Sequence, residues 1–279
     1  MADVTNSGQV SAWLAAAILF ACALLAPGGL APAAAADMAV DVELVLAVDV
    51  SLSMDRQEQE LQREGYVAAF RHPEVLAAIR AGQYQRVAVT YFEWAGERIQ
   101  RPVIGWRLID SAASAEAFAA ELEKASISGA RRTSISAALD HASRLFDGNG
   151  FNGLKRVVDV SGDGPNNMGL PVETLRDRLV EQGIVINGLP IVLKPGSALG
   201  FYDIRNLQYY YEDCVIGGLG AFLVTVRDES EFADAIRRKL VQELASPAFG
   251  PRLIRTQFQP PRAKSDCMIG EKLWNEMRE

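Results

Sequence analysis

Strand-like apolar runs alternate with helix-like segments through most of this 279-residue chain. The first run, residues 44–48, is continuously apolar, which suits a strand that is buried on both faces of a parallel sheet. The clearest helix is expected over 135–146, because its apolar residues recur at intervals of three and four. Strands that alternate with helices imply βαβ units. The sequence therefore predicts an α/β, Rossmann-like fold with a mainly parallel central sheet flanked by helices.

The other expected elements follow from the same patterns and from helix-capping signals. Residues 98–108 are expected to pair beside 86–92 as an edge strand. Further strands are expected over 86–92, 155–160, 184–192 and 221–226, and further helices over 55–70, 114–125, 171–182 and 228–244.

Oxygen-bearing side chains follow the first expected strand directly, in the Asp-x-Ser-x-Ser motif formed by Asp49, Ser51 and Ser53. In open α/β sheets, ligands bind beyond the carboxyl ends of the strands, and hard cations such as Mg²⁺ prefer oxygen ligands. The motif alone is short, and hydroxyls after a strand often only cap the next helix. Two more loops strengthen the metal hypothesis, because Thr133 precedes the clearest helix and Asp163 follows another apolar strand.

This ordered three-loop pattern resembles the metal-ion-dependent adhesion site of the von Willebrand factor type A family, over roughly residues 40–245. The stretches 159–167 and 210–214 are similar to an exported bacterial subgroup of unknown function. The resemblance implies a von Willebrand type A-like fold and binding of Mg²⁺, with Mn²⁺ or Ca²⁺ as alternatives. It implies five metal ligands, which are Asp49, Ser51, Ser53, Thr133 and Asp163.

The resemblance also implies a function, namely metal-dependent protein binding of the adhesion type without enzymatic activity. Neutral hydroxyl ligands leave the cation with unquenched positive charge, so an acidic side chain of a protein partner would complete its coordination. One departure from the family pattern is the pair Arg131 and Arg132, where small or polar residues are more usual. If these cations point inward they lower the metal affinity, which leaves open a scaffold that keeps the fold and binds no metal.

A metal-dependent, phosphoesterase-like hydrolase on the same site is the alternative function, with Asp49 as nucleophile or ligand. Two-metal hydrolysis needs a denser set of carboxylates and often His, and the chain has only two His. The sequence contains no Gly-x-Ser-x-Gly elbow and no phosphate-binding loop. The net charge of −7 argues against a nucleic-acid partner, which would require a basic patch.

The N-terminal residues 1–36 resemble a Sec-type signal peptide with cleavage near Ala36. An apolar block over 13–26 is followed by helix-breaking residues and an Ala-x-Ala site, although the segment lacks Lys and Arg. An uncleaved anchor is the alternative, but about 14 apolar residues are too few to span a bilayer. We therefore expect a periplasmic or secreted mature chain without a stable membrane span. It would comprise a type A-like domain over 37–245 and a C-terminal extension over 246–279.

Cys214 and Cys267 are the two cysteines that remain after this cleavage. In an oxidising compartment a lone pair of cysteines is a candidate disulfide, and two separate thiols are the alternative. Two other features allow two interpretations each. Asp159 either supports the metal ligands or is a buried structural carboxylate, and the tyrosines at 209–211 form either an exposed contact patch or part of the core.

Overall fold

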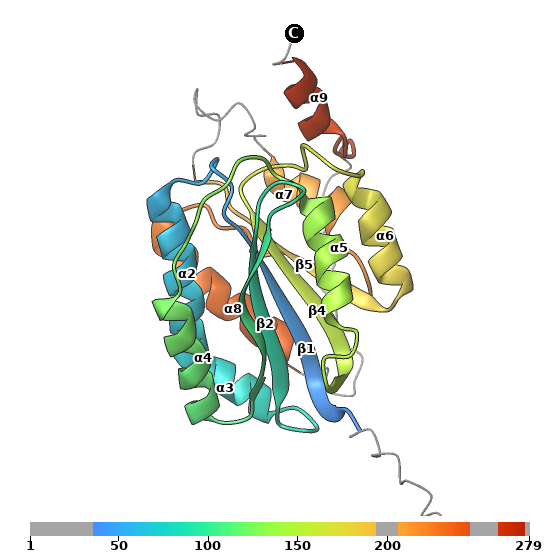
Figure 1. The fold of residues 1–279 in the computed structure, drawn as a ribbon. Coiled ribbons are helices and arrows are strands. Elements are labelled where there is room, and N and C mark those ends of the chain that lie inside the picture. The colour runs from blue at the N-terminus through green and yellow to red at the C-terminus, as the bar shows by residue number, and fades with distance from the viewer. Residues whose placement is uncertain (1–35, 194–205, 246–261, 277–279) are drawn as a thin grey trace, which may run out of the picture. The chain divides into compact units, whose positions relative to one another are not determined.

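The computed structural model describes residues 36–193, 206–245 and 262–276 (Figure 1). The chain divides into two compact units, Met1–Ala36 and Asp37–Glu279, and the second holds every helix and strand of the described residues. The predicted signal peptide lies almost wholly outside the described residues and stays a prediction. Among the helices of the described residues, none has the length and apolar character needed to cross a bilayer.

One mixed sheet forms the centre of the described structure, with the strand order β3-β2-β1-β4-β5. Neighbouring strands run parallel, except that β3 pairs antiparallel with β2 at the edge. The predicted α/β class and the predicted edge strand are therefore confirmed. The strands are β1 (Met38–Asp49), β2 (Val87–Trp94), β3 (Gln100–Ile109), β4 (Phe151–Gly162) and β5 (Ile184–Pro190).

Helices cover both faces of the sheet (Figure 1). The first face is covered by α2 (Arg56–Arg71), α3 (Pro73–Arg80), α4 (Ala112–Lys124) and α8 (Phe232–Leu244). The second face is covered by α5 (Ile135–Leu145), α6 (Val172–Glu181), α7 (Leu207–Tyr210) and the π-helix η1 (Tyr211–Val215).

The strand β1 is buried on both sides because its residues alternate between two hydrophobic clusters. Leu44, Leu46 and Val48 belong to the cluster under α2 and α8, whereas Val45 and Ala47 face the cluster under α5 and α6. This alternation is the two-residue period of a strand. It explains why an uninterrupted apolar run forms the central strand.

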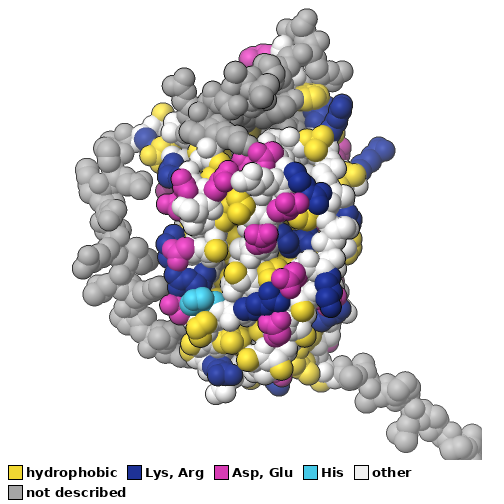
Figure 2. Space-filling model, turned by 90° about the vertical axis from the view of Figure 1, so that its left-hand side faces the viewer, with side chains coloured by type: hydrophobic (Ala, Val, Ile, Leu, Met, Phe, Trp, Pro, Cys, Tyr) yellow, Lys and Arg dark blue, Asp and Glu magenta, His cyan; other side chains and the backbone are white. Residues whose placement is uncertain are grey.

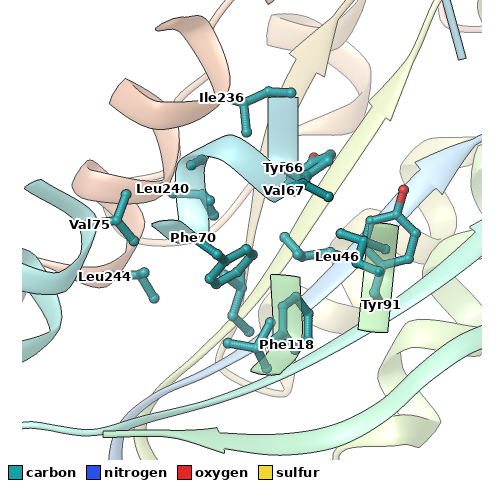
Figure 3. Packing of buried hydrophobic residues seen from close by; sticks show 14 of the residues in the cluster. Leu46, Tyr66, Val67, Phe70, Val75, Tyr91, Phe118, Ile236, Leu240 and Leu244 are labelled. Carbon is teal, nitrogen blue, oxygen red and sulfur yellow. The ribbon is translucent and has the colours of Figure 1, made fainter. Parts of the chain in front are cut away.

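Aromatic side chains fill the first of these clusters, as Figure 3 shows. The rings of Phe70 and Phe118 lie 4.6 Å apart between centroids, and they join α2 to α4. The rings of Tyr66 and Tyr91 meet edge to face at 5.7 Å and join α2 to β2. Such contacts add to the burial of apolar area, so α2 is firmly fixed behind the loop that connects it to β1.

Charged side chains of both signs are interspersed on the surface seen in Figure 2. Ion pairs join oppositely charged side chains of neighbouring helices, since Arg71 of α2 pairs with Glu116 and Glu123 of α4 at 2.9 and 3.0 Å. A face of this kind lacks the single-sign field that a phosphate backbone requires.

Three expectations about secondary structure were wrong or incomplete. The predicted strand over 221–226 forms only isolated bridges, with Leu223 opposite Gly188 and Val226 opposite Ile191. The short helix α3 was not predicted; it begins at Pro73, after a His72 cap whose side chain accepts from the Glu74 N–H. The C-terminal extension also contains a helix, α9 (Ile269–Glu276).

Candidate metal centre

The loop after β1 is short and is fixed at both ends. Asp49 ends the strand, and its Oδ1 accepts a hydrogen bond of 2.7 Å from the Ser51 N–H, which closes a tight turn. The hydroxyl oxygens of Ser51 and Ser53 lie 2.8 Å apart. Asp55 then caps α2 by accepting from the Glu58 N–H at 2.9 Å. The Asp-x-Ser-x-Ser motif therefore projects its oxygens from a rigid strand-to-helix connection.

The loop after β4 reaches this first loop at the same edge of the sheet. Val48 of β1 and Ser161 of β4 are register partners in a parallel pair, so the two strands end side by side. Beyond the strand ends, the Ser53 hydroxyl donates to Oδ1 of Asp163 at 2.6 Å. Two of the predicted site residues, far apart in the sequence, are therefore in direct contact.

The loop before α5, which carries Thr133, is joined to both of the others. The Leu52 N–H donates to the Ala130 carbonyl at 2.9 Å, and the Ala130 N–H donates to the Val50 carbonyl at 3.1 Å. On the other side, the Thr133 N–H donates to the side-chain oxygen of Asn167 at 3.1 Å, while the Asn167 N–H donates to the Thr133 carbonyl at 2.9 Å. Asn167 belongs to the loop that carries Asp163, so two hydrogen bonds join this loop to the loop that carries Thr133.

The five predicted ligands differ in their exposure. Asp49, Ser51 and Thr133 are buried, Asp163 is half-buried and Ser53 is exposed. A site built from them would have a closed inner side at the sheet edge and would open to solvent beside Ser53. Their role as metal ligands remains a prediction.

The chemistry of this donor set fits a divalent cation. Oδ2 of Asp49 is a buried oxygen without a hydrogen-bond partner of normal geometry among the described residues. Burial and the nearby Asp163 carboxylate together raise the pKa of Asp49 well above its usual value. A cation between these two carboxylates would pair the orphaned oxygen and offset their repulsion. The residues present therefore suit an oxygen-ligated ion.

The candidate centre differs from a carboxylate-rich or His-rich site. In the part of the chain that the structure describes, no group of three or more His, Cys, Asp or Glu side chains is placed to hold a metal. The candidate centre has two carboxylates, Asp49 and Asp163, and its other donors are hydroxyls. The two carboxylates can balance the charge of a divalent ion, and the hydroxyls add oxygen donors without adding negative charge.

A buried carboxylate that pairs with two arginines holds the chain that leads to Thr133. The carboxylate of Glu93, at the end of β2, pairs with both Arg63 and Arg101. Arg63 also donates to the main-chain oxygens of Leu122 and Ala125 at 2.9 and 3.0 Å. These hydrogen bonds fix the backbone at the end of α4, where the loop that leads to Thr133 begins.

Sequence reasoning missed two residues that support the site. Asn166 fixes α5, because its Oδ1 accepts from the Ser136 N–H at 3.0 Å, and its own N–H donates to the Tyr210 hydroxyl at 3.1 Å. Tyr211 is also missed as a site residue; its hydroxyl is buried beside Asp49. The signals in the sequence were the polar run that follows Asp163 and the stretch 210–214, which both contribute to the resemblance described above.

The remaining candidate residues have structural surroundings that decide between the earlier interpretations. Asp159 forms a buried ion pair with Lys239 at 2.6 Å, so it is a structural carboxylate. Tyr210 and Tyr211 are fully buried and therefore belong to the core rather than to an exposed patch. Arg131 is exposed, while the guanidinium of Arg132 lies over the Trp274 ring at 3.1 Å from its centroid.

The C-terminal segment is linked to the second face of the sheet. A disulfide joins Cys214 and Cys267, whose Cα atoms are 5.5 Å apart. Beside it, Arg262 pairs with Asp213 at 2.5 Å, and this guanidinium lowers the pKa of Asp213 to about 2. In the helix α9, Glu271 accepts from the Asn166 side-chain amide at 2.7 Å. The segment thus contacts the loop that follows Asp163.

Several solved structures are similar to this chain. Proximal thread matrix protein 1 from the mussel byssus matches with a TM-score of 0.54 and 15% identity, over 76% of this chain and 50% of that one. The pilus adhesin SpaC from Lactobacillus rhamnosus GG matches with a TM-score of 0.52 and 12% identity, over 75% and 31%. A von Willebrand factor type A protein from Catenulispora acidiphila has a TM-score of 0.47 and 18% identity, over 74% and 43%.

The chain spans half the length of the mussel protein and less than half the length of the other two proteins. At these identities the likeness shows the fold alone, and no curated protein sequence matches significantly. The predicted resemblance to von Willebrand factor type A domains is confirmed at the level of the fold. Residues 39–248 match the family model described as "Protein of unknown function (DUF1194)", and the chain therefore belongs to that family, with a fold of the von Willebrand factor type A kind.

Proposed function

We propose that this chain is an exported, divalent-metal-dependent protein-binding module of the adhesion type. The proposed ligands of Mg²⁺, or of Mn²⁺ or Ca²⁺ in its place, are Asp49, Ser51, Ser53, Thr133 and Asp163. The observation that carries the proposal is the convergence of three loops beside a buried carboxylate oxygen of Asp49 that has no hydrogen-bond partner among the described residues.

Each part of the proposed centre has a physical task. Asp49 is held by the turn at Ser51 and supplies negative charge on the buried side. Ser53 and Asp163 supply oxygens on the side that faces solvent. When bound, the ion would offer an open coordination position to a carboxylate of a partner protein. Because the hydroxyl ligands add no negative charge, the proposed site carries no excess of negative charge that would repel that carboxylate.

A binding role agrees with the description of one structural neighbour, since SpaC is a pilus adhesin. Hydrolysis has less support. Of the two His residues, His72 caps α3 and His141 packs edge to face on Phe92, with ring centroids 4.8 Å apart. Neither belongs to the three loops of the candidate centre. We therefore propose a non-enzymatic module.

The proposal is tested by thermal unfolding of residues 37–279 with and without millimolar Mg²⁺ or Mn²⁺. An ion that binds only the folded state stabilises it by about 2.7 kcal/mol at a hundredfold excess over its dissociation constant. For a domain of this size that is a rise of about 5–10 °C in Tm. Asp49→Ala and Thr133→Ala should remove the rise. Asp177→Ala, which changes an exposed aspartate of α6, should keep it.

A wild-type chain that is folded and shows no rise with either metal contradicts the proposal. Metal-dependent hydrolysis of phosphate or acyl esters that disappears in Asp49→Ala would instead favour the enzyme.

The partner is sought by capture from the cell envelope of the source organism with and without chelator. Export is checked by the mass of the mature chain from that envelope, because cleavage near Ala36 removes the apolar block.

A further inference from the structure

The hydroxyl of Tyr211 is a buried polar group that makes no hydrogen bond within the described residues. A buried hydroxyl without a partner is unfavourable, and such groups in native structures require an explanation. A tyrosine that served only as packing could be a phenylalanine with no loss. The position of this hydroxyl therefore points to a role beyond packing.

Oδ2 of Asp49, which also has no hydrogen-bond partner within the described residues, lies near the Tyr211 hydroxyl. A Cβ placed on Gly162 would be 2.8 Å from the Tyr211 hydroxyl and 2.9 Å from Oδ2 of Asp49. Both oxygens therefore border the same small space, which exists because residue 162 has no side chain. One hydroxyl donor and one carboxylate acceptor that face the same space are complementary. They can be joined by a small shift or through one bridging water.

The ring of Tyr211 is fixed firmly enough to direct its hydroxyl. It begins the π-helix η1, and single π-helical turns occur frequently at functional sites. A Cβ on Gly188 of β5 would lie 2.7 Å from a ring carbon of Tyr211, so the ring packs directly on the strand. Three residues further on, Cys214 is tied to Cys267 by the disulfide. The hydroxyl thus has one direction, towards the end of β4.

We propose that Tyr211 is a positioning residue of the metal site, whose hydroxyl donates to Asp49, directly or through one water, and so fixes the orientation of that carboxylate. The inference rests on the proposed function, because it assigns a support to one of the proposed ligands. Hydrogen-bonded supports of metal ligands commonly change the metal affinity by about 10–100-fold when they are removed.

Tyr211→Phe tests this role, since it removes the hydroxyl and keeps the ring. The matched control is Tyr66→Phe, which removes another buried hydroxyl, one that donates to Asp159 at 3.3 Å and lies outside the three loops. Mn²⁺ affinity is measured by electron paramagnetic resonance titration of residues 37–279, and Tm is measured without metal. The tyrosine absorbance is recorded before and after the addition of metal.

The expected result is a Mn²⁺ affinity that is about 10–100-fold weaker in Tyr211→Phe, with no loss of Tm in the absence of metal. Tyr66→Phe should show the wild-type affinity and a lower Tm. Metal should change the tyrosine absorbance of the wild type and of Tyr66→Phe, and less so that of Tyr211→Phe. Only a hydroxyl that acts on the site accounts for this combination.

Equal Mn²⁺ affinities of the wild type and Tyr211→Phe would overturn the inference and leave the proposed function intact. A weaker affinity accompanied by a lower Tm without metal, as a general loss of packing would give, would also overturn it. A folded wild-type chain that binds no Mn²⁺ would overturn both, and is distinguished by the wild-type titration alone.

Discussion

Replacing Lys239 with Met should destabilise the folded chain more than any surface substitution. The ammonium of this lysine is fully buried on α8, where it lies 2.6 Å from Oδ1 of Asp159 and pairs with Glu243. Asn187 also donates to the Glu243 carboxylate, at 3.0 Å. Methionine keeps an apolar stem of similar length, so the main loss is the positive charge. Two buried carboxylates then remain without a cation.

The magnitude follows from that uncompensated charge. Removing one partner of a buried ion pair costs about 3–5 kcal/mol, far above the 0–1 kcal/mol or so that is typical of an exposed pair. For a chain of this size the loss corresponds to a fall in Tm of roughly 6–20 °C. The same change at an exposed lysine should shift Tm by about 2 °C or less.

The pH dependence has a defined sign. Burial, followed by the charge of Asp159, raises the pKa of Glu243 from 4.5 to about 7 in the folded state. The folded chain therefore holds this proton at a pH where the unfolded chain has released it. The stability that Glu243 contributes is complete below its unfolded pKa and is lost as the pH rises through about 7. The charge of Lys239 lowers the pKa of Glu243, so its loss favours the protonated form of that carboxyl group. The stability deficit of Lys239→Met should therefore shrink as the pH falls.

Thermal and urea unfolding, followed by circular dichroism at about pH 5 and about pH 8, measure this deficit. Lys155→Met is the control, because the ammonium of Lys155 is only partly buried and donates to the main-chain oxygen of Glu243 at 3.3 Å. It should lose much less stability and show little dependence on pH. A variant Lys239→Met with the wild-type Tm at the higher pH, or with a deficit that grows on acidification, would refute the electrostatic reasoning.

Two further changes probe the region around the candidate centre. Reduction of the disulfide between Cys214 and Cys267, which are separated by 53 residues, should lower the stability by about 4 kcal/mol in the chain-entropy model. Thermal unfolding with and without reductant measures this, and an unchanged Tm contradicts it. Gly162→Ala should lower both Tm and Mn²⁺ affinity, because its Cβ would fill the space shared by Tyr211 and Asp49. A titration that gives the wild-type affinity would count against that shared space.

Much of the fold could be predicted because its signals are local. The continuous apolar run of β1 and the apolar stripe of α5 each record the burial of their own segment. The segment 221–226 has the same apolar character, yet Gly218 and Gly220 before it adopt left-handed backbone conformations. The chain therefore bends and meets β5 at single bridges only. Apolar composition indicates burial, and the pairing of strands depends on the path of the chain.

The candidate site could be predicted in part for a related reason. Asp49 and Asp163 each follow a strand of the parallel sheet, so the strand-end rule places them at one edge without knowledge of any contact. Tyr211 follows no predicted strand and enters the site from a π-helix on the covering layer. No short motif encodes that approach, which depends on the packing of η1 against Gly188.

The two arginines before Thr133 do not argue against a metal. The guanidinium of Arg132 lies over the face of Trp274, where the aromatic ring attracts a cation and directs it towards α9. Arg131 is exposed, so solvent screens its effect on an ion held beside the buried Asp49. An exposed cation two residues before Thr133 attracts acidic groups from a distance and raises the rate of encounter with them. The departure from the type A pattern is therefore compatible with the metal and with the acidic partner that we propose.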